Sequence, residues 1–165
     1  MKAAFCPDCG HQLQAVERRG RERPTCAGCG YVHYRNPAVG VSVILRDEAG
    51  RVLLGQRATG EYAGLWCIPC GYVEWDEDVR DAARREFEEE TGMTVELRGI
   101  AAVHSNCHNR DKQTVGIWFE GAAVGGTLQP VDGELTELAW FPPGEPPDLA
   151  FPTDLLVLRQ LAGEG

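Results

Sequence analysis

Residues 71–93 read GYVEWDEDVRDAARREFEEETGM and hold the most informative pattern in the chain. On a helix, with about 100° between successive residues, one stripe is small and apolar in its first half and carboxylic in its second. This stripe contains Val79, Ala82, Ala83, Glu86, Glu89 and Glu90. A solvated acidic helix would place its charges opposite its apolar residues, whereas here they continue the same stripe. We therefore expect a helix from about Glu77 to Thr91, with Gly92 as its C-cap.

Three carboxylates on one helix face repel one another and are costly to desolvate. A divalent cation with a preference for oxygen removes both problems, and Mg²⁺ characteristically shares carboxylates, water and substrate phosphates. Arg85 lies one turn before Glu89 and can orient that carboxylate. The stripe therefore predicts a divalent-metal site, with an ordinary solvated acidic helix as the alternative.

Outward from this segment, the sequence alternates between strand and turn patterns. Strands are expected at residues 39–46, 51–57, 96–103, 114–120 and 137–141, with a short one in LWCIP at 65–69. A second helix is expected in TDLLVLRQLAG at 153–163, with Thr153 or Asp154 as its N-cap. This order predicts one α/β domain with a mixed sheet over residues 36–165.

Residues 1–35 have no apolar periodicity that could form a core, but they contain two Cys-x-x-Cys-Gly turns separated by sixteen residues. Four thiolates from two such turns can converge tetrahedrally on Zn²⁺, which supplies folding free energy that a small module lacks. We predict a structural zinc ribbon with the ligands Cys6, Cys9, Cys26 and Cys29. Free or disulfide-bonded thiols are the alternative, as is replacement of one cysteine by His11 or His33.

The composition, 43% hydrophobic and 25% charged, is that of an ordinary globular protein. No stretch has the length of a membrane span, and the first residues show no signal-peptide core. Two close cysteine pairs without a signal peptide favour metal thiolates over disulfides, so we expect a cytoplasmic protein without membrane contact. The net charge of −9 makes a dedicated nucleic-acid binder unlikely on physical grounds, although residues 1–35 hold six basic and three acidic side chains.

Gly71, Glu77 and the run from Arg85 to Met93 stand at the spacing of the Nudix box, so the chain resembles the Nudix hydrolase family. The resemblance implies an α/β/α sandwich with a mixed sheet, preceded here by the zinc ribbon. It also implies Mg²⁺- or Mn²⁺-dependent attack of water on the pyrophosphate of a nucleoside diphosphate derivative. Dimeric relatives imply a homodimer.

The same resemblance assigns roles to individual residues. The side chains of Glu86, Glu89 and Glu90 and the backbone of Gly71 would bind the catalytic metal. Arg85 would hold Glu89, which counts with Arg85 among the catalytic residues, and Glu77 would support the loop and the helix. In some members a loop glutamate is the general base, and Glu134 or Glu137 lies where that loop is expected.

A zinc ribbon before a Nudix domain resembles two subgroups, the NADH pyrophosphatases and a set similar to plant chloroplast FAD and ADP-ribose pyrophosphatases. The junction CGYVHYRNP at 29–37 and the stretch LAFPTD at 149–154 favour the second, and an SQPWPFPxS-like motif of the NADH group is absent after the box. We expect hydrolysis of ADP-ribose or FAD, with NADH behind them. A sensory or RNA-binding Nudix module and the sanitation of oxidised nucleoside triphosphates are the alternatives.

Other side chains are candidates for contact with substrate. Arg57 ends a strand that faces the expected cleft and could bind phosphate. Tyr62, Trp66 and Trp118 could stack on a base or a flavin, although each also suits packing.

Three further cysteines have no assigned role. Cys67 and Cys70 stand in a segment whose extended backbone would point them to roughly opposite faces, so they are poorly placed to chelate one ion. We expect Cys67 to be a small buried residue and Cys70 to be a loop residue close to the catalytic metal. Cys107, with His104 and His108 on either side, could ligate a metal by residue type, but a turn needs no ligand there.

Overall fold

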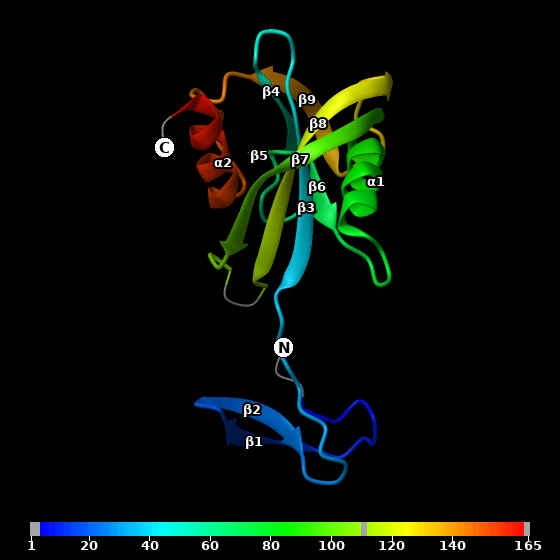
Figure 1. Ribbon diagram of the computed structural model, residues 1–165, viewed down its shortest axis with the longest axis vertical. Coiled ribbons are helices and arrows are strands. Elements are labelled where there is room, and N and C mark those ends of the chain that lie inside the picture. Colours follow the sequence, from blue (N-terminus) through cyan, green and yellow to red (C-terminus); the bar gives the residue numbers. More distant parts are fainter. Residues whose placement is uncertain (1–3, 110–111, 164–165) are drawn as a thin grey trace. The chain divides into compact units, whose positions relative to one another are not determined.

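A computed structural model describes residues 4–109 and 112–163 (Figure 1). The chain divides into two compact units, Met1–Pro37 and Ala38–Gly165. The first is a β-hairpin with two cysteine turns, and the second is an α/β structure. Among the described residues, no helix combines the length and the apolar character that crossing a bilayer would require.

The small unit is built on an antiparallel hairpin of β1 (Leu13–Arg18) and β2 (Arg21–Cys26). Arg19 and Gly20 form its two-residue turn, both with positive φ (53° and 75°), as tight hairpin turns demand. β1 is almost wholly exposed, so this hairpin buries little apolar surface. An alternation of apolar and polar residues marks a strand in the sequence only where one face of the strand is buried. Because β1 is exposed on both faces, the sequence shows no such alternation there.

The larger unit contains a four-stranded mixed sheet in the order β6-β3-β8-β7. β3 pairs in parallel with β8 and antiparallel with β6, and β7 pairs antiparallel with β8. The mixed sheet was expected, but β6 was not, and β7 and β8 are both longer than the sequence predicts. The strands are β3 (Ala38–Leu45), β6 (Cys70–Tyr72), β7 (Met93–Asn106) and β8 (Thr114–Gly126).

A second, antiparallel sheet has the order β5-β4-β9. Its strands are β4 (Val52–Arg57), β5 (Trp66–Cys67) and β9 (Leu135–Phe141). The chain passes from this sheet to the first between β5 and β6, through Ile68 and Pro69 alone. That crossing brings residues 67–71 to the place where the two sheets meet.

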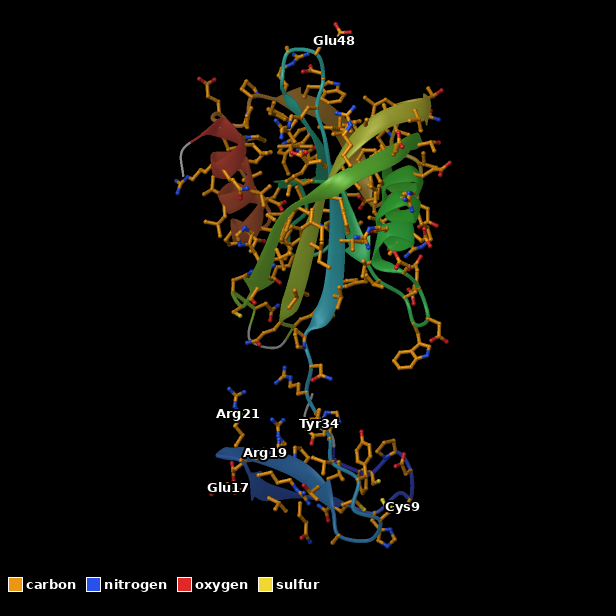
Figure 2. The ribbon with its side chains drawn as sticks, in the orientation of Figure 1. Cys9, Glu17, Arg19, Arg21, Tyr34 and Glu48 are labelled. Carbon is orange, nitrogen blue, oxygen red and sulfur yellow. The ribbon has the colours of Figure 1, made fainter. Side chains whose placement is uncertain are left out.

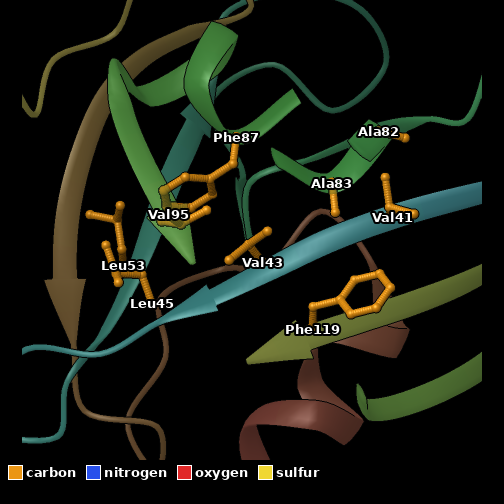
Figure 3. Packing of buried hydrophobic residues seen from close by; sticks show 9 residues of the cluster. All are labelled: Val41, Val43, Leu45, Leu53, Ala82, Ala83, Phe87, Val95 and Phe119. Atoms are coloured by element: carbon orange, nitrogen blue, oxygen red, sulfur yellow. The ribbon is translucent and has the colours of Figure 1, made fainter. Parts of the chain in front are cut away.

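Two helices cover the sheets on opposite sides in Figure 1, α1 (Val79–Thr91) and α2 (Pro152–Ala162). α1 packs Ala83 and Phe87 against Val43 of β3 and Val95 of β7 (Figure 3). α2 packs Val157 and Leu158 against the other face, where they contact a cluster from β3, β4 and β8. The fold is therefore the expected α/β arrangement with helices on both sides of a mixed sheet.

The first helix starts two residues later than the sequence predicts. Asp78 is its N-cap, and its carboxylate accepts a hydrogen bond from the Arg80 N–H at 2.8 Å. Gly92 closes the helix in the left-handed conformation (φ 69°), as predicted. The buried stripe is centred on Phe87 and contains Glu90, whereas Glu89 lies outside it and is exposed.

The prediction that Thr153 or Asp154 caps the second helix is wrong. Phe151 occupies the N-cap without a side-chain hydrogen bond, and Pro152 is the first helical residue. Asp154 is instead buried in the first turn, where its carboxylate accepts hydrogen bonds from the Ile68 N–H at 3.0 Å and from Trp118 Nε1 at 3.1 Å. It thus ties α2 to the β5–β6 crossing and to β8.

We predict that Asp154→Asn destabilises the protein by about 1–3 kcal/mol, because an amide can accept from one of the two donors but presents its own N–H groups to the other. Burial raises the pKa of Asp154 to about 7 from an ordinary 3.8. The folded state then holds this proton more tightly than the unfolded state, so its stabilising contribution is full below about pH 4 and is lost as pH rises through about 7.

Urea unfolding of both proteins between pH 4 and 8 measures this effect. The free energy of unfolding should fall more with rising pH in the wild type than in Asp154→Asn. Parallel pH profiles for the two proteins would contradict the assignment.

Candidate active site and metal centre

Arg85 is the organising side chain of the candidate site. Its Nε and Nη2 donate to the two carboxylate oxygens of Glu77 at 2.8 and 2.9 Å. Its Nη1 donates to Glu86 Oε1 at 2.9 Å and to Glu89 Oε2 at 3.1 Å, and Nη2 also donates to the Tyr72 carbonyl at 3.2 Å. These bonds match the five N–H donors of a guanidinium, so Arg85 fixes α1 to the loop that precedes it.

Glu77 accepts two of these hydrogen bonds, one on each carboxylate oxygen. Its hydrogen bonds with Arg85 lower the pKa of Glu77 to about 2, and the Glu74 N–H donates to the same carboxylate at 3.0 Å. These contacts fit the supporting role expected of Glu77 and the orienting role expected of Arg85 toward Glu89.

Glu86 lies directly against the backbone of Gly71. A Cβ at residue 71 would lie 1.9 Å from Glu86 Cδ, so this carboxylate can stay where it is only if residue 71 is glycine. Burial raises the pKa of Glu86, Arg85 opposes the shift, and the negative charges of Glu89 and Glu134 add to it.

Glu90 is 1% exposed and has one unused acceptor. Its Oε2 accepts a hydrogen bond from the Cys70 N–H at 2.8 Å, whereas Oε1 has no hydrogen-bond partner among the described residues. Burial raises the pKa of Glu90 well above its ordinary range. An ionised, buried carboxylate without a positive partner is strongly unfavourable, so this oxygen suits a cation.

A cavity of 430 Å³ opens beside Glu86 and Gly71. Among the described residues that line it, Arg57 and Lys112 carry positive charge, and aromatic rings come from Tyr62, Tyr72 and Phe151. Glu134 also lines the cavity, and its negative charge raises the pKa of both Glu86 and Glu90.

Arg57 ends β4 and reaches the cavity, as the sequence predicts. Its Nε is buried without a hydrogen-bond partner among the described residues, and its guanidinium lies 5.7 Å from the centre of the Phe151 ring. Burial lowers the pKa of Arg57, but the charges of Cys67 and Cys70 outweigh burial and raise it. A permanent cation with a free donor is suited to phosphate.

Tyr62, the first aromatic candidate, lies at the cavity wall. The hydroxyl of Tyr62 and Nε2 of His108 share a hydrogen bond of 3.1 Å, and His108 Nδ1 contacts the Asn106 side-chain oxygen. The Tyr62 ring packs edge-on against Phe151 at 5.4 Å. Neither Asn106 nor Phe151 stands out in the sequence, because only the fold brings these loops together.

The other two aromatic candidates pack inside the protein. Trp66 meets Phe141 edge-on at 4.9 Å, away from the cavity. Trp118 reaches the cavity wall but is 4% exposed, with its Nε1 bonded to Asp154. A metal site of His104, Cys107 and His108 does not form among the described residues, because His104 stacks on Trp118 and His108 bonds Tyr62.

The third cysteine pair is divided between the core and the cavity, as the sequence predicts. Cys67 is fully buried, and its thiol lies 3.8 Å from the Gly55 carbonyl oxygen. Cys70 is half-buried and lines the cavity. The hydrogen-bonding interaction with Cys67, together with burial, raises the pKa of the Cys70 thiol well above its ordinary range. The crossing at Ile68 and Pro69 places Cys67 at the end of β5 and Cys70 at the start of β6, in different sheets.

The four ribbon cysteines gather at one point. Their sulfur atoms lie within 4.8 Å of one another, and Cys6–Cys29, Cys9–Cys26 and Cys9–Cys29 are separated by 3.6, 3.4 and 3.5 Å. Zn–S bonds of about 2.3 Å place tetrahedral ligands about 3.8 Å apart, so the set fits zinc. In Figure 2, Cys9 lies at the end of this unit that holds the cysteine turns, and Arg19 and Arg21 lie at the opposite end, at the hairpin turn.

The two cysteine turns repeat one backbone pattern. The N–H of Gly10 donates to the Cys6 carbonyl at 2.9 Å, and that of Gly30 to the Cys26 carbonyl at 3.0 Å. Hydrogen bonding from the Cys29 backbone lowers the pKa of Cys26 to about 6, which favours the thiolate at that one ligand.

Glu86, Glu89 and Glu90 do not form a comparable cluster of ligand atoms among the described residues. Among the described residues, the ribbon cysteines are the one set of three or more candidate ligands that meets at a point. Arg85 instead engages Glu86 and Glu89. The unpartnered Glu90 oxygen and the glycine that makes room for Glu86 nevertheless fit a divalent cation in donor type and position.

Comparison with known proteins places this geometry in a family. The model of the NUDIX domain matches residues 36–161. The chain belongs to the Nudix family. It is therefore a Nudix pyrophosphohydrolase, of a family whose enzymes use divalent metals and act on nucleotide-type substrates.

Several Nudix proteins resemble the chain over most of its length. An ADP-ribose pyrophosphatase of Methanocaldococcus jannaschii is 31% identical over 129 residues, covering 77% of this chain and 75% of that protein. An NAD-capped RNA hydrolase NudC of Stutzerimonas stutzeri is 29% identical over 83% of this chain, which spans only 47% of that protein. The crystal structure of a NUDIX hydrolase from Nitrosomonas europaea superposes with a TM-score of 0.83 at 32% identity, covering 97% of this chain and 91% of that one.

We predict that the purified protein contains one zinc ion per chain and that Cys26→Ser loses it, because three thiolates and a hydroxyl make a much weaker site. Metal content by inductively coupled plasma spectrometry measures this directly. Cys107→Ser is the matched control, since Cys107 is exposed and outside the cluster, and it should keep the zinc. Equal zinc in wild type and Cys26→Ser would exclude the four-cysteine site.

Proposed function

We propose that this Nudix enzyme hydrolyses the pyrophosphate bond of a nucleoside diphosphate derivative, with ADP-ribose or FAD preferred over NADH. The observation that carries the proposal is the carboxylate set held by Arg85 at the edge of a 430 Å³ cavity that also contains Arg57 and Lys112. Negative charge on one side suits a metal, and the cations suit the phosphates of the substrate.

In this proposal Glu86, Glu89, Glu90 and the backbone of Gly71 hold Mg²⁺ or Mn²⁺. When bound, the ion polarises phosphoryl oxygens and lowers the pKa of the attacking water. Arg85 keeps Glu86 and Glu89 oriented, and a cation would compete with its Nη1 for both carboxylates. Glu90 contributes its unpartnered Oε1, and the Cys70 N–H fixes the other oxygen.

Glu134 is the proposed general base. It lines the cavity, it is exposed, and its charge acts on Glu86 and Glu90, so it faces the metal carboxylates across the cavity. Two hydrogen bonds support its loop. The Glu134 N–H donates to the Asp132 side chain at Oδ1 (2.8 Å), and the Ala58 N–H donates to the Glu134 carbonyl (2.8 Å). Glu137 lies in β9, where it pairs with Gln56 of β4, and it is absent from the cavity lining. These positions favour Glu134 over Glu137 as the general base.

The substrate preference rests on two supports. The ADP-ribose pyrophosphatase relative is similar over three quarters of both chains, whereas the NudC relative is matched over about half its length. The cavity also offers aromatic rings at Tyr62, Phe151 and Tyr72, against which the group beyond the phosphates could pack.

We further propose a structural zinc ribbon at residues 1–35 and a catalytic domain at 36–165. A homodimer and a cytoplasmic location stay predictions.

A substrate panel tests the function. The protein is incubated with Mg²⁺ or Mn²⁺ and ADP-ribose, FAD, NADH, diadenosine polyphosphates or oxidised dGTP, and products are separated chromatographically. AMP from ADP-ribose or FAD, reduced by about 10²-fold or more in Glu89→Gln, is the expected result. Turnover of the triphosphate alone would instead assign nucleotide sanitation, and silence across the panel would favour the RNA-binding alternative.

We predict that Gly71→Ala lowers kcat by about 10–100-fold while the protein stays folded, because the added Cβ must displace the Glu86 carboxylate. Gly99→Ala is the matched control, since a Cβ there meets nothing within 4 Å. Circular dichroism checks folding, and steady-state kinetics with the best substrate checks activity. An active Gly71→Ala enzyme would remove Glu86 from the proposed metal site.

A further inference from the structure

The β1–β2 hairpin separates its charges between two faces. In its register Arg18 lies directly opposite Arg21, and the next pair is Glu17 opposite Glu22. Because successive residues of a strand point to opposite faces, the two arginines lie on one face and the two glutamates on the other. Arg23 is two residues beyond Arg21 in β2 and shares its face. We call Arg18, Arg21 and Arg23 the arginine face.

The stability of the hairpin does not explain the arginine face. Like charges directly opposite each other in an antiparallel pair are destabilising, whereas opposite charges at those positions would stabilise it. Within the part of the chain that the structure describes, none of the three arginines forms an ion pair. Arg18 and Arg21 are exposed, and Arg23 is half-buried. Such a surface suits a negatively charged partner from outside the chain.

An exposed aromatic ring borders the arginine face. After the second cysteine turn the chain runs back along β2, where the His33 N–H donates to the Pro24 carbonyl at 2.8 Å. The next residue is Tyr34, and the Arg23 guanidinium lies 4.7 Å from the centre of its ring. Tyr34 is nevertheless 57% exposed, so its ring is open to a ligand beside the arginines.

We propose that the arginine face and Tyr34 bind single-stranded nucleic acid, with guanidinium groups on the phosphates and the tyrosine ring stacked on an unpaired base. A guanidinium matches the oxygens of a phosphate, and a basic surface with an aromatic ring holds single strands without reading their sequence. Residues 1–35 hold six basic against three acidic side chains, so this unit is positively charged although the whole chain is not. This binding is additional to the proposed hydrolysis and does not rest on it.

Fluorescence anisotropy on the zinc-loaded whole protein, without Mg²⁺ or Mn²⁺, tests the binding apart from any hydrolysis. The probes are end-labelled single strands of about 12 nucleotides, one of RNA and one of DNA with the same sequence. We expect a dissociation constant of about 10⁻⁴–10⁻⁶ M at physiological salt, and three phosphate contacts predict a loss of affinity of about 20-fold between about 50 and 200 mM salt. Binding of either strand supports the site, and binding of neither would overturn the proposal.

Paired variants locate the binding on the chain. Arg18→Ala/Arg21→Ala should weaken binding by about tenfold and reduce its dependence on salt. It removes a like-charge pair, so the ribbon should keep its zinc, which metal analysis checks. Arg46→Ala/Arg51→Ala is the matched control, because it removes the same charge from exposed positions of the larger unit, and it should bind like the wild type. Equal losses in the two double variants would reflect net charge alone and contradict the assignment.

The ring separates nucleic acid from other polyanions. Tyr34→Ala should weaken binding by about tenfold and Tyr34→Phe should not, because stacking on a base needs the ring and not the hydroxyl. Inorganic polyphosphate and vesicles of anionic lipid carry negative charge without a base, so both should compete weakly for the labelled strand. If either competes as well as unlabelled RNA, the surface binds polyanions or membranes in general and the proposal fails. These measurements give the same answer whichever nucleotide the enzyme hydrolyses.

Discussion

The Arg85 guanidinium, whose N–H donors all have hydrogen-bond acceptors, is the interaction on which the rest of the site depends. It binds the loop residues Glu77 and Tyr72 on one side and the helix residues Glu86 and Glu89 on the other. Without it, carboxylates one turn apart on α1 would repel, and the loop between β6 and the helix would lose its main attachment. Because every donor is occupied, small movements of Arg85 must change several contacts together.

The β5–β6 crossing is the second element that shapes the site. Within a few residues it supplies the Ile68 N–H that Asp154 accepts from, the Cys70 N–H that Glu90 accepts from, and the glycine beside Glu86. Helix α2 lies far from α1 in the sequence, but both helices accept hydrogen bonds from this short segment, through Asp154 and Glu90. Mutation in this segment is expected to affect both helices.

The ribbon obtains its stability differently from the larger unit. Its first strand is almost entirely exposed, and its buried side chains include Cys6 and Cys26, two of the four clustered cysteines. Metal coordination can replace the missing core, because binding free energy of a structural zinc is folding free energy. The larger unit instead buries a continuous set of apolar residues around Phe87 and Phe119.

The sequence alone determined the family, the α/β class, the carboxylate-bearing helix α1 with its Gly92 cap, and the four clustered cysteines. Each of these depends on residue types at fixed local spacing. The tertiary structure decided the rest. Asp154 reads as a helix cap but is a buried acceptor for Ile68 and Trp118, 86 and 36 residues away. Cys67 and Cys70 are three residues apart in the sequence, but the change of sheet between β5 and β6 leaves one in the core and the other at the cavity. Local periodicity describes one element at a time, whereas these contacts arise where elements distant in sequence pack together.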